Sequence, residues 1–194
     1  MKKVLTLVAL LGFASFANFV CGTAFAQQKD DQEFIVKLGF QPQGIATMGG
    51  TNYNTNVGMA MGIEYFQYFG NIVAAGGGAL YEFPRNFKDN LKGDISFLPI
   101  YVGLKMRTPL HGLDNNYAFL AGRLGYSAFM NSNPDWIKSS SGGMYYSAGL
   151  GVCISYLLLE AVYAVNNFSF TTPADKNYDE RYSTITLYAG FKFE

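Results

Sequence analysis

The chain has 194 residues, of which 49% are hydrophobic and 16% aromatic, and its 14 basic and 14 acidic residues balance one another. This balance excludes the large single-sign electrostatic field that is typical of nucleic-acid-binding proteins and of polybasic membrane anchors. The sequence has 22 Gly, 17 Phe and 14 Tyr against one Trp and one His. Because aromatic side chains suit pleated surfaces and glycine permits tight curvature, this composition favours an all-β fold.

The N-terminus has the pattern of a secretory leader. Lys2 and Lys3 are followed by an almost unbroken apolar run up to Val20, and small residues precede Gln27. We therefore predict a cleavable signal peptide over residues 1–26 and a single mature domain over residues 27–194. No later stretch approaches the roughly 18 uninterrupted apolar residues that a membrane helix needs.

The cysteines add little to the fold. The alternative is a lipoprotein that is acylated at Cys21. A small residue is expected just before such a cysteine, and none of the three residues that end at Val20 is small. Once the leader is removed, Cys153 is alone. No intrachain disulfide can then form, although an exported chain enters an oxidising compartment.

After the leader, short segments alternate apolar residues with small or polar ones. In the clearest segment Met59, Met61 and Ile63 alternate with glycine, alanine and Glu64. Since successive side chains of a strand point to opposite faces, each segment has one apolar face and one polar face. Segments of this kind cover residues 34–40, 57–65, 72–83, 96–107, 117–129, 144–154, 157–165 and 183–193.

Two of these segments have irregularities. In 72–83 the run Gly76-Gly77-Gly78 blurs the alternation, and the segment is predicted to be a strand because its neighbours need a partner between them. In 96–107, Pro99 removes a backbone donor and suggests a bulge.

The pattern predicts an up-and-down antiparallel transmembrane β-barrel of about eight strands, an even number as bacterial single-chain barrels require. The connections alternate between short links, at 68–71 and 155–156, and longer polar ones. The longer ones are 42–54, 84–92, 130–141 and 166–181. Short periplasmic turns and long extracellular loops would place both termini in the periplasm, although 108–116 is long for a turn.

Aromatic residues are expected in belts at the two membrane interfaces. The predicted periplasmic belt is Tyr65, Tyr68, Tyr156, Phe191 and Phe193. The predicted outer belt is Phe83, Tyr126, Phe129, Tyr146 and Phe168. The alternative is a soluble sandwich or a lipocalin-like barrel, but a soluble barrel needs polar residues on its outer face, and the faces assigned outward carry none.

Four short motifs resemble a known family. Leu98–Lys105, Gly122–Tyr126, Leu159–Tyr163 and the terminal Phe191-Lys192-Phe193 are similar to the small bacterial outer-membrane β-barrel domain family, of OmpA/OmpX type, in the porin-like superfamily. The resemblance implies a monomer in the bacterial outer membrane, in contact with its lipids. It also implies that Phe191 and Phe193 act as an assembly signal for the barrel assembly machinery, although Glu194 follows them. Such a likeness supports the fold and leaves function open.

The inward faces carry a cluster of charges. An eight-stranded barrel is just wide enough inside for side chains or one small ligand, so we expect an ionic plug in which Glu64 and Glu160 pair with neighbouring bases. The predicted lumen cluster is Lys37, Glu64, Lys105, Arg107, Arg123, Glu160 and Lys192. Its bases outnumber its acids. Arg107 and Lys192 could reach water at the rim, tyrosines could solvate the cluster, or part of the inward assignment could be wrong.

The expected function is a structural or surface-interaction role for a non-enzymatic barrel, through its extracellular loops and without nucleic acid. Trp136, Phe168, Phe170 and Tyr178 are candidate contact points, although these aromatics could equally pack loop on loop. The first alternative is a narrow, porin-like channel for small solutes.

A lipid-modifying enzyme is a weaker alternative. It would need a histidine with serine and a carboxylate near the outer leaflet, and the single histidine, His111, falls in a predicted periplasmic turn. No cofactor or metal site is predicted. Asp175, Asp179 and Glu180 could bind calcium weakly, but Lys176 and Arg181 lie among them, and a solvated charged loop is favoured.

Overall fold

The computed structural model describes residues 32–88, 94–110, 116–130, 138–172, 174 and 176–193. The predicted leader at 1–26 lies outside the described residues, as do His111, Trp136, Asp175 and Glu194. Residues 32–194 form one compact unit, which is described here by itself. No helix of the described residues is long and apolar enough to cross a membrane.

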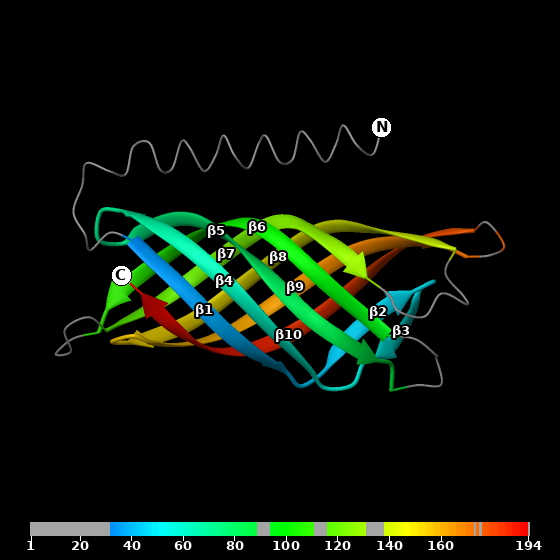
Figure 1. Cartoon of the computed structure of the whole chain (residues 1–194), viewed down its shortest axis with the longest axis horizontal. Coiled ribbons are helices and arrows are strands. Elements are labelled where there is room, and N and C mark those ends of the chain that lie inside the picture. The colour runs from blue at the N-terminus through cyan, green and yellow to red at the C-terminus, as the bar shows by residue number, and fades with distance from the viewer. Residues whose placement is uncertain are drawn as a thin grey trace. The chain divides into compact units, whose positions relative to one another are not determined.

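Eight long antiparallel strands form a closed ring in the order β1-β4-β5-β6-β7-β8-β9-β10, and β1 pairs with β10 to close it. The strands cross the barrel obliquely (Figure 1). The bounds are β1 Gln32–Gln41, β4 Gly58–Phe69, β5 Val73–Asn86, β6 Asp94–Pro109, β7 Tyr117–Met130, β8 Ser139–Ile154, β9 Leu157–Thr171 and β10 Asn177–Phe193. This ring confirms the predicted all-β, up-and-down barrel of eight strands.

Two further strands prolong the first hairpin of the barrel. β2 (Gly44–Met48) continues the direction of β1 and also pairs with β10, while β3 (Thr51–Asn54) pairs with β2. Gly49 and Gly50, with φ of 57° and 80°, join them in a two-residue turn that requires left-handed backbone. The longer polar connection predicted over 42–54 is therefore mostly strand.

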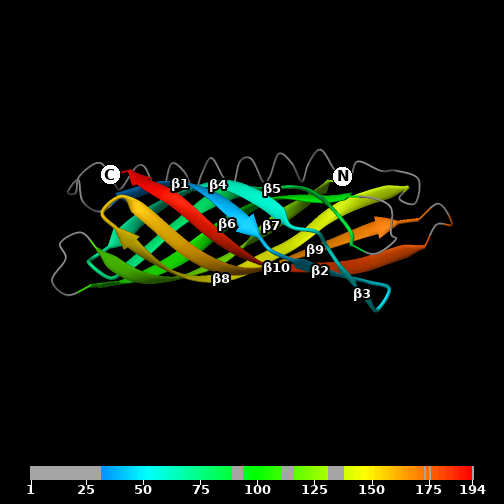
Figure 2. The ribbon, with the colours of Figure 1, turned by 90° about the horizontal axis from the view of Figure 1, so that it is seen from below.

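The predicted loop over 166–181 is also mostly strand. β9 continues to Thr171 and β10 begins at Asn177, and the two pair from Phe191↔Leu157 up to Asn177↔Thr171. We call the upper part of the sheet the extension: β2, β3, 139–143 of β8, 166–171 of β9 and 177–183 of β10. Figure 2 shows β9 and β10 projecting at the same end of the barrel as β2 and β3.

The opposite end of the barrel has tight turns, and we call it the turn end. Gly70, with φ of 76°, follows β4, and Ser155, with φ of 54°, lies between β8 and β9. The Ser155 amide donates a hydrogen bond to Asn116 Oδ1 at 2.6 Å, which helps to hold this left-handed residue. The short links predicted at 68–71 and 155–156 are thus present.

The outer wall carries a band of exposed apolar side chains, which we call the girdle. Leu38 is 60% exposed, Leu150 63% and Leu187 52%, whereas their neighbours Lys37, Gly149 and Tyr188 are buried. A contiguous apolar exterior of this extent is unfavourable in water and matches the lipid-facing band of a membrane barrel. The predicted inward and outward faces hold along the strands.

The aromatic belts are only partly as predicted. Tyr126, Tyr156, Phe191 and Phe193 are more than half exposed on the outer wall, and Phe83 is 37% exposed. Tyr68, Phe129 and Phe168, however, are 3%, 8% and 2% exposed and lie inside the barrel. Their assignment to the belts was wrong. The position of a residue along its strand sets its height in the barrel wall, but the alternation of side chains decides whether it faces the lipid or the lumen.

The glycines that blurred β5 make room inside the barrel. A Cβ on Gly76 would collide with the Tyr65 carbonyl, and one on Gly78 would lie 2.9 Å from the Tyr101 hydroxyl. The bulge expected at Pro99 is absent, since β6 and β7 pair without interruption through it. The register shift between β5 and β6 instead lies between Glu82 and Arg85.

Candidate functional site: a filled lumen and an outer pocket

Four charged side chains from four strands form a closed ring of ion pairs inside the barrel. Lys37 Nζ lies 3.0 Å from Glu64 Oε1 and 2.9 Å from Glu160 Oε2. Arg123 Nε lies 2.6 Å from Glu64 Oε1, and Arg123 Nη2 lies 2.6 Å from Glu160 Oε1. The two acids and two bases alternate around this ring, which spans the lumen from β1 and β4 to β7 and β9. We call it the ion-pair ring.

The ion-pair ring is fully removed from solvent. Its four side chains are each at most 1% exposed, and the Tyr101 hydroxyl donates a further hydrogen bond of 2.7 Å to Glu64. A Cβ on Gly149 would lie 2.6 Å from Glu160 Oε1, so glycine leaves the space that this carboxylate occupies. Unpaired, any one of these charges would be strongly destabilising at such a depth.

A second cluster lies toward the turn end and is centred on Glu33. Its carboxylate lies 2.6 Å from Lys105 Nζ, accepts a 2.6 Å hydrogen bond from the Tyr117 hydroxyl, and lies 3.6 Å from Arg107 Nη1. The Arg107 side chain is 20% exposed, and its guanidinium stacks 3.6 Å from the centre of the Tyr68 ring. In this cluster one carboxylate, Glu33, interacts with two bases. Cation–π contacts with aromatic rings stabilise these bases further.

A third cluster lies toward the extension. Glu82 Oε2 lies 3.3 Å from Arg85 Nη2, and Asn166 Nδ2 donates to Glu82 Oε1 at 3.1 Å. Arg85 also donates hydrogen bonds to Gln41 and to the hydroxyl of Tyr182. All five residues are buried.

The structure therefore places the seven predicted lumen residues inside the barrel but divides them between two clusters. Lys37, Glu64, Arg123 and Glu160 come together, while Lys105 and Arg107 lie with Glu33. Lys192 is 4% exposed, with its Nζ 5.5 Å from the centre of the Tyr117 ring.

Three charged lumen residues were missed from the sequence. Glu33 lies one residue before the predicted start of its strand, on the same face as Ile35, and that parity could have found it. Glu82 lies in the glycine-blurred strand. Arg85 follows the register shift, where alternation no longer reports the face. The two missed acids account for part of the predicted excess of bases.

Aromatic rings fill the lumen above the third cluster. Phe97 packs against Phe129, Phe168 and Tyr182 with ring centroids 5.3 to 5.6 Å apart, and Phe129 stacks on Phe168 at 4.5 Å. We call these four residues the aromatic plug. Phe168 and Phe170 are only 2% and 7% exposed, so their predicted role as surface contact points was wrong.

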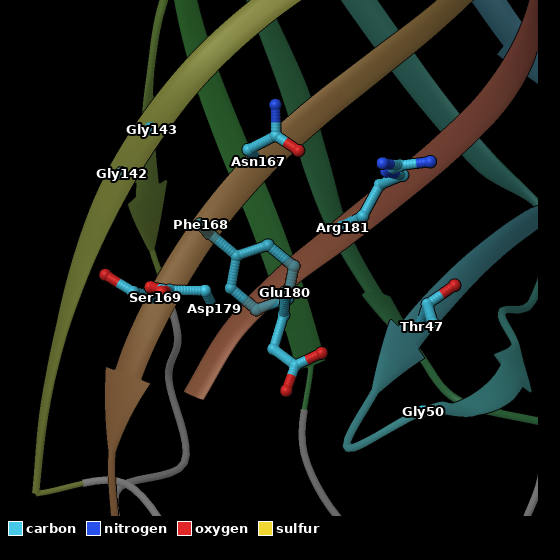
Figure 3. A pocket seen from close by; sticks show the side chains of 10 residues that line it. All are labelled: Thr47, Gly50, Gly142, Gly143, Asn167, Phe168, Ser169, Asp179, Glu180 and Arg181. Carbon is cyan, nitrogen blue, oxygen red and sulfur yellow. The ribbon is translucent and has the colours of Figure 1, made fainter. Parts of the chain in front are cut away.

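A pocket of about 650 Å³ lies on the extension, where β8, β9, β10 and β2 run side by side (Figure 3). We call it the outer pocket. Strand alternation puts Arg181, Asp179 and Asn167 on the outer face, opposite the buried Phe168 and Glu180. The lining residues are Thr47, Gly50, Gly142, Gly143, Asn167, Phe168, Ser169, Asp179, Glu180 and Arg181.

Glu180 ties the outer pocket to the turn of the first hairpin. Its Oε1 accepts a 2.9 Å hydrogen bond from the Gly49 amide. Burial raises the pKa of Glu180, and the Gly49 hydrogen bond opposes that rise. Within the described residues, no three His, Cys, Asp or Glu side chains are grouped so that they could hold a metal ion.

Neither a family model nor a curated protein matches this sequence. Among solved structures, Neisserial surface protein A is similar with a TM-score of 0.55 and 11% identity, covering 83% of this chain and 97% of that one. OprG from Pseudomonas aeruginosa has a TM-score of 0.48 and 14% identity, over 84% and 97% of the two chains. Ail of Yersinia pestis has a TM-score of 0.47 and 18% identity, over 84% and 99%.

The likeness to Neisserial surface protein A concerns the fold, since so few residues are identical. This chain has the fold of the small bacterial outer-membrane β-barrels. Its girdle adds the physical requirement for a place in a membrane. The fold and the girdle both support the family resemblance that the sequence motifs indicate and the outer-membrane location that it implies.

Proposed function

We propose that this protein is a non-enzymatic, non-conducting outer-membrane β-barrel with a structural or surface-interaction role that its extension performs. The observation that carries the proposal is the filled lumen. The ion-pair ring, the clusters on either side of it and the aromatic plug occupy successive levels between the turn end and the extension.

A solute would have to displace these side chains to pass. The lumen of an eight-stranded barrel has room for side chains or for one small ligand, and here side chains take that room. Opening the ion-pair ring would separate charges that have no water to replace their partners, which is a costly rearrangement. A steady pore is therefore disfavoured. Contacts with partner molecules would instead be made by the surface of the protein outside the membrane.

The extension is the surface proposed to face outward. Small barrels have short turns on the periplasmic side and longer structures on the extracellular side, and the two ends of this barrel differ in that way. Phe191 and Phe193, exposed at the end of β10, remain the predicted signal for the assembly machinery.

Conductance tests the filled lumen. The full protein inserted in a planar bilayer is expected to give no steady openings above background. An open porin inserted in the same bilayer is the positive control for insertion and detection. Steady openings of the wild-type protein would overturn the proposal and favour the small-solute channel.

Labelling of intact cells tests the direction of the barrel. In a Cys153→Ser background, Asn52→Cys on β3 is expected to react with a membrane-impermeant maleimide, because Asn52 is exposed on the extension. Asn71→Cys, exposed in the β4–β5 turn, is the matched control and is expected to react only after cell lysis. The reverse pattern would contradict a surface role for the extension.

A further inference from the structure

The outer pocket lies directly beyond the girdle on the outer face of β9, β10 and β2. On that face Tyr163 and Ile185 pair across β9 and β10, and each is 52% exposed, so they belong to the girdle. Ile45 of β2 is 40% exposed and pairs with Ser183, one outward position above Ile185. The pocket is thus continuous with the surface that contacts lipid chains.

The Arg181 side chain can reach the height of lipid headgroups. It is four residues beyond Ile185 on the same face, which is about 13 Å along the strand at about 3.3 Å per residue. With a strand tilt of about 40°, this corresponds to about 10 Å along the bilayer normal. The headgroup layer reaches roughly 5 to 8 Å beyond the hydrocarbon core, a gap that a flexible arginine side chain can cover.

The polar groups around Arg181 are arranged side by side. Asn167 and Thr47 lie directly opposite Arg181 on the two neighbouring strands. Asn167 Nδ2 donates to the Met144 carbonyl at 3.1 Å, and Thr47 donates to Asn52 at 2.8 Å, so both side chains are held in place. Arg181 is exposed and forms no ion pair with any of the described residues.

We propose that the outer pocket binds the headgroup of a membrane lipid that carries a phosphate and hydroxyl groups. The forked guanidinium of Arg181 suits two phosphate oxygens, and it approaches them from the membrane side of the pocket. Asp179, one outward position farther from the girdle and opposite Ser169, can accept hydrogen bonds from headgroup hydroxyls. The Asp179 carboxylate would repel the negative charge of a headgroup that carries only a phosphate. Hydroxyl groups that donate hydrogen bonds to Asp179 offset this repulsion, so the pocket should prefer headgroups that carry them.

The occupant is a lipid rather than a free solute because the pocket opens beside the girdle. A lipid whose chains cover Tyr163 and Ile185 already has its headgroup beside the pocket, so it loses less translational freedom on binding than a free solute would. The inference needs only that the barrel crosses a bilayer. Failure of the conductance or labelling test would leave it standing.

The test is a lipid titration of the full protein in detergent micelles, read by native mass spectrometry. Phosphatidylglycerol, which has a phosphate and two hydroxyls, is compared with phosphatidylmethanol, which has the same charge on its phosphate and no hydroxyl. Arg181→Gln is expected to weaken phosphatidylglycerol binding about tenfold, as expected for loss of a hydrogen-bonded charge. Arg181→Lys, which keeps the charge but loses the fork, should fall between.

Lys176→Gln is the matched control, since it removes one exposed positive charge at the far tip of the extension. It is expected to change binding by less than about twofold, as for a distant screened charge. Equal losses in Arg181→Gln and Lys176→Gln, or no preference for phosphatidylglycerol over phosphatidylmethanol, would overturn the proposal. Complete displacement of the lipid by inorganic phosphate would also overturn it, because the site would then be one for a free anion.

Discussion

The lumen and the extension are built from the same strands but are stabilised by different groups. In the membrane-spanning part, the apolar residues point outward and the charges point inward, where Glu64 and Glu160 alternate with Lys37 and Arg123. In the extension the order reverses, so that Phe168 packs inside and Arg181 faces out. The surrounding solvent changes from lipid to water along one strand, and the side chains change face accordingly.

This difference teaches where substitutions should be costly. A buried charge between strands has no alternative partner, while a polar side chain on the outer face of the extension can turn to water. The ion-pair ring should therefore be sensitive to single changes, and the outer face of the extension should tolerate them.

The largest effect is expected when Arg123, one of the two bases of the ion-pair ring, is removed. Arg123→Ala leaves Glu64 and Glu160 with Lys37 as their shared base and should cost about 3–5 kcal/mol of unfolding free energy. Urea unfolding in detergent, followed by the gel shift between unboiled and boiled protein, measures it. Arg181→Gln should cost less than about 0.5 kcal/mol, as for an exposed position.

A second variant guards against a trivial explanation. Arg123→Ala combined with Glu160→Gln should recover part of the loss, because Lys37 and Glu64 then remain as a balanced pair. If the single and double variants were equally unstable, the volume of Arg123 rather than its charge would explain the effect.

The aromatic plug should come next. Phe168→Ala empties a site that is 2% exposed and packs against Phe97 and Phe129, so it should cost about 3 kcal/mol. Phe191→Ala, at 60% exposure on the girdle, should cost clearly less in the same refolding assay. Equal losses would mean that the plug packs no better than the lipid-facing wall.

The turn between β2 and β3 should show a smaller effect. Gly49 has a φ of 57°, so Gly49→Ala should cost about 1–2 kcal/mol from left-handed backbone alone. Gly122→Ala is the control, since nothing lies within 4 Å of the added Cβ. Hydrogen exchange of the β2 and β3 amides should increase in the first variant and stay unchanged in the second.

The smallest expected effect is a pH dependence of the same turn. Because burial raises the pKa of Glu180 above its ordinary 4.5, the folded state holds this proton more tightly than the unfolded state. The contribution to stability is therefore fully present below pH 4.5 and declines as the pH rises through the raised pKa. Exchange of the β2 and β3 amides other than Gly49, corrected for intrinsic rates, should increase as the pH rises through this range, and the increase should be absent in Glu180→Gln.

The membrane-spanning part was largely predictable because lipid and lumen impose opposite demands on alternate residues. Met59, Met61 and Ile63 could only face outward once Glu64 faced inward. The extension was mistaken for loops because its outer face is polar and its turn residues are scattered through 166–181. Its inward-facing Phe168 and Phe170 were visible in the sequence, but they resembled exposed loop aromatics.

The partners inside the lumen could not be predicted. Lys37 and Glu160 are 123 residues apart, and their meeting depends on the stagger of the closed ring, which no local pattern encodes. Arg85 was missed for a related reason, since the register shift before it reverses the parity that would have marked it.

The ion-pair ring has a consequence for biogenesis. Lys37 is contributed by the first strand and Glu160 by the next to last, so a growing barrel that still lacks its final hairpin holds a cation with half its counter-charge missing. Such contacts between distant parts of a chain form late and reward only the complete structure. A barrel that lacks its last two strands should therefore be sensitive to proteases. Folding of the lumen should be completed in one concerted step when these strands are added.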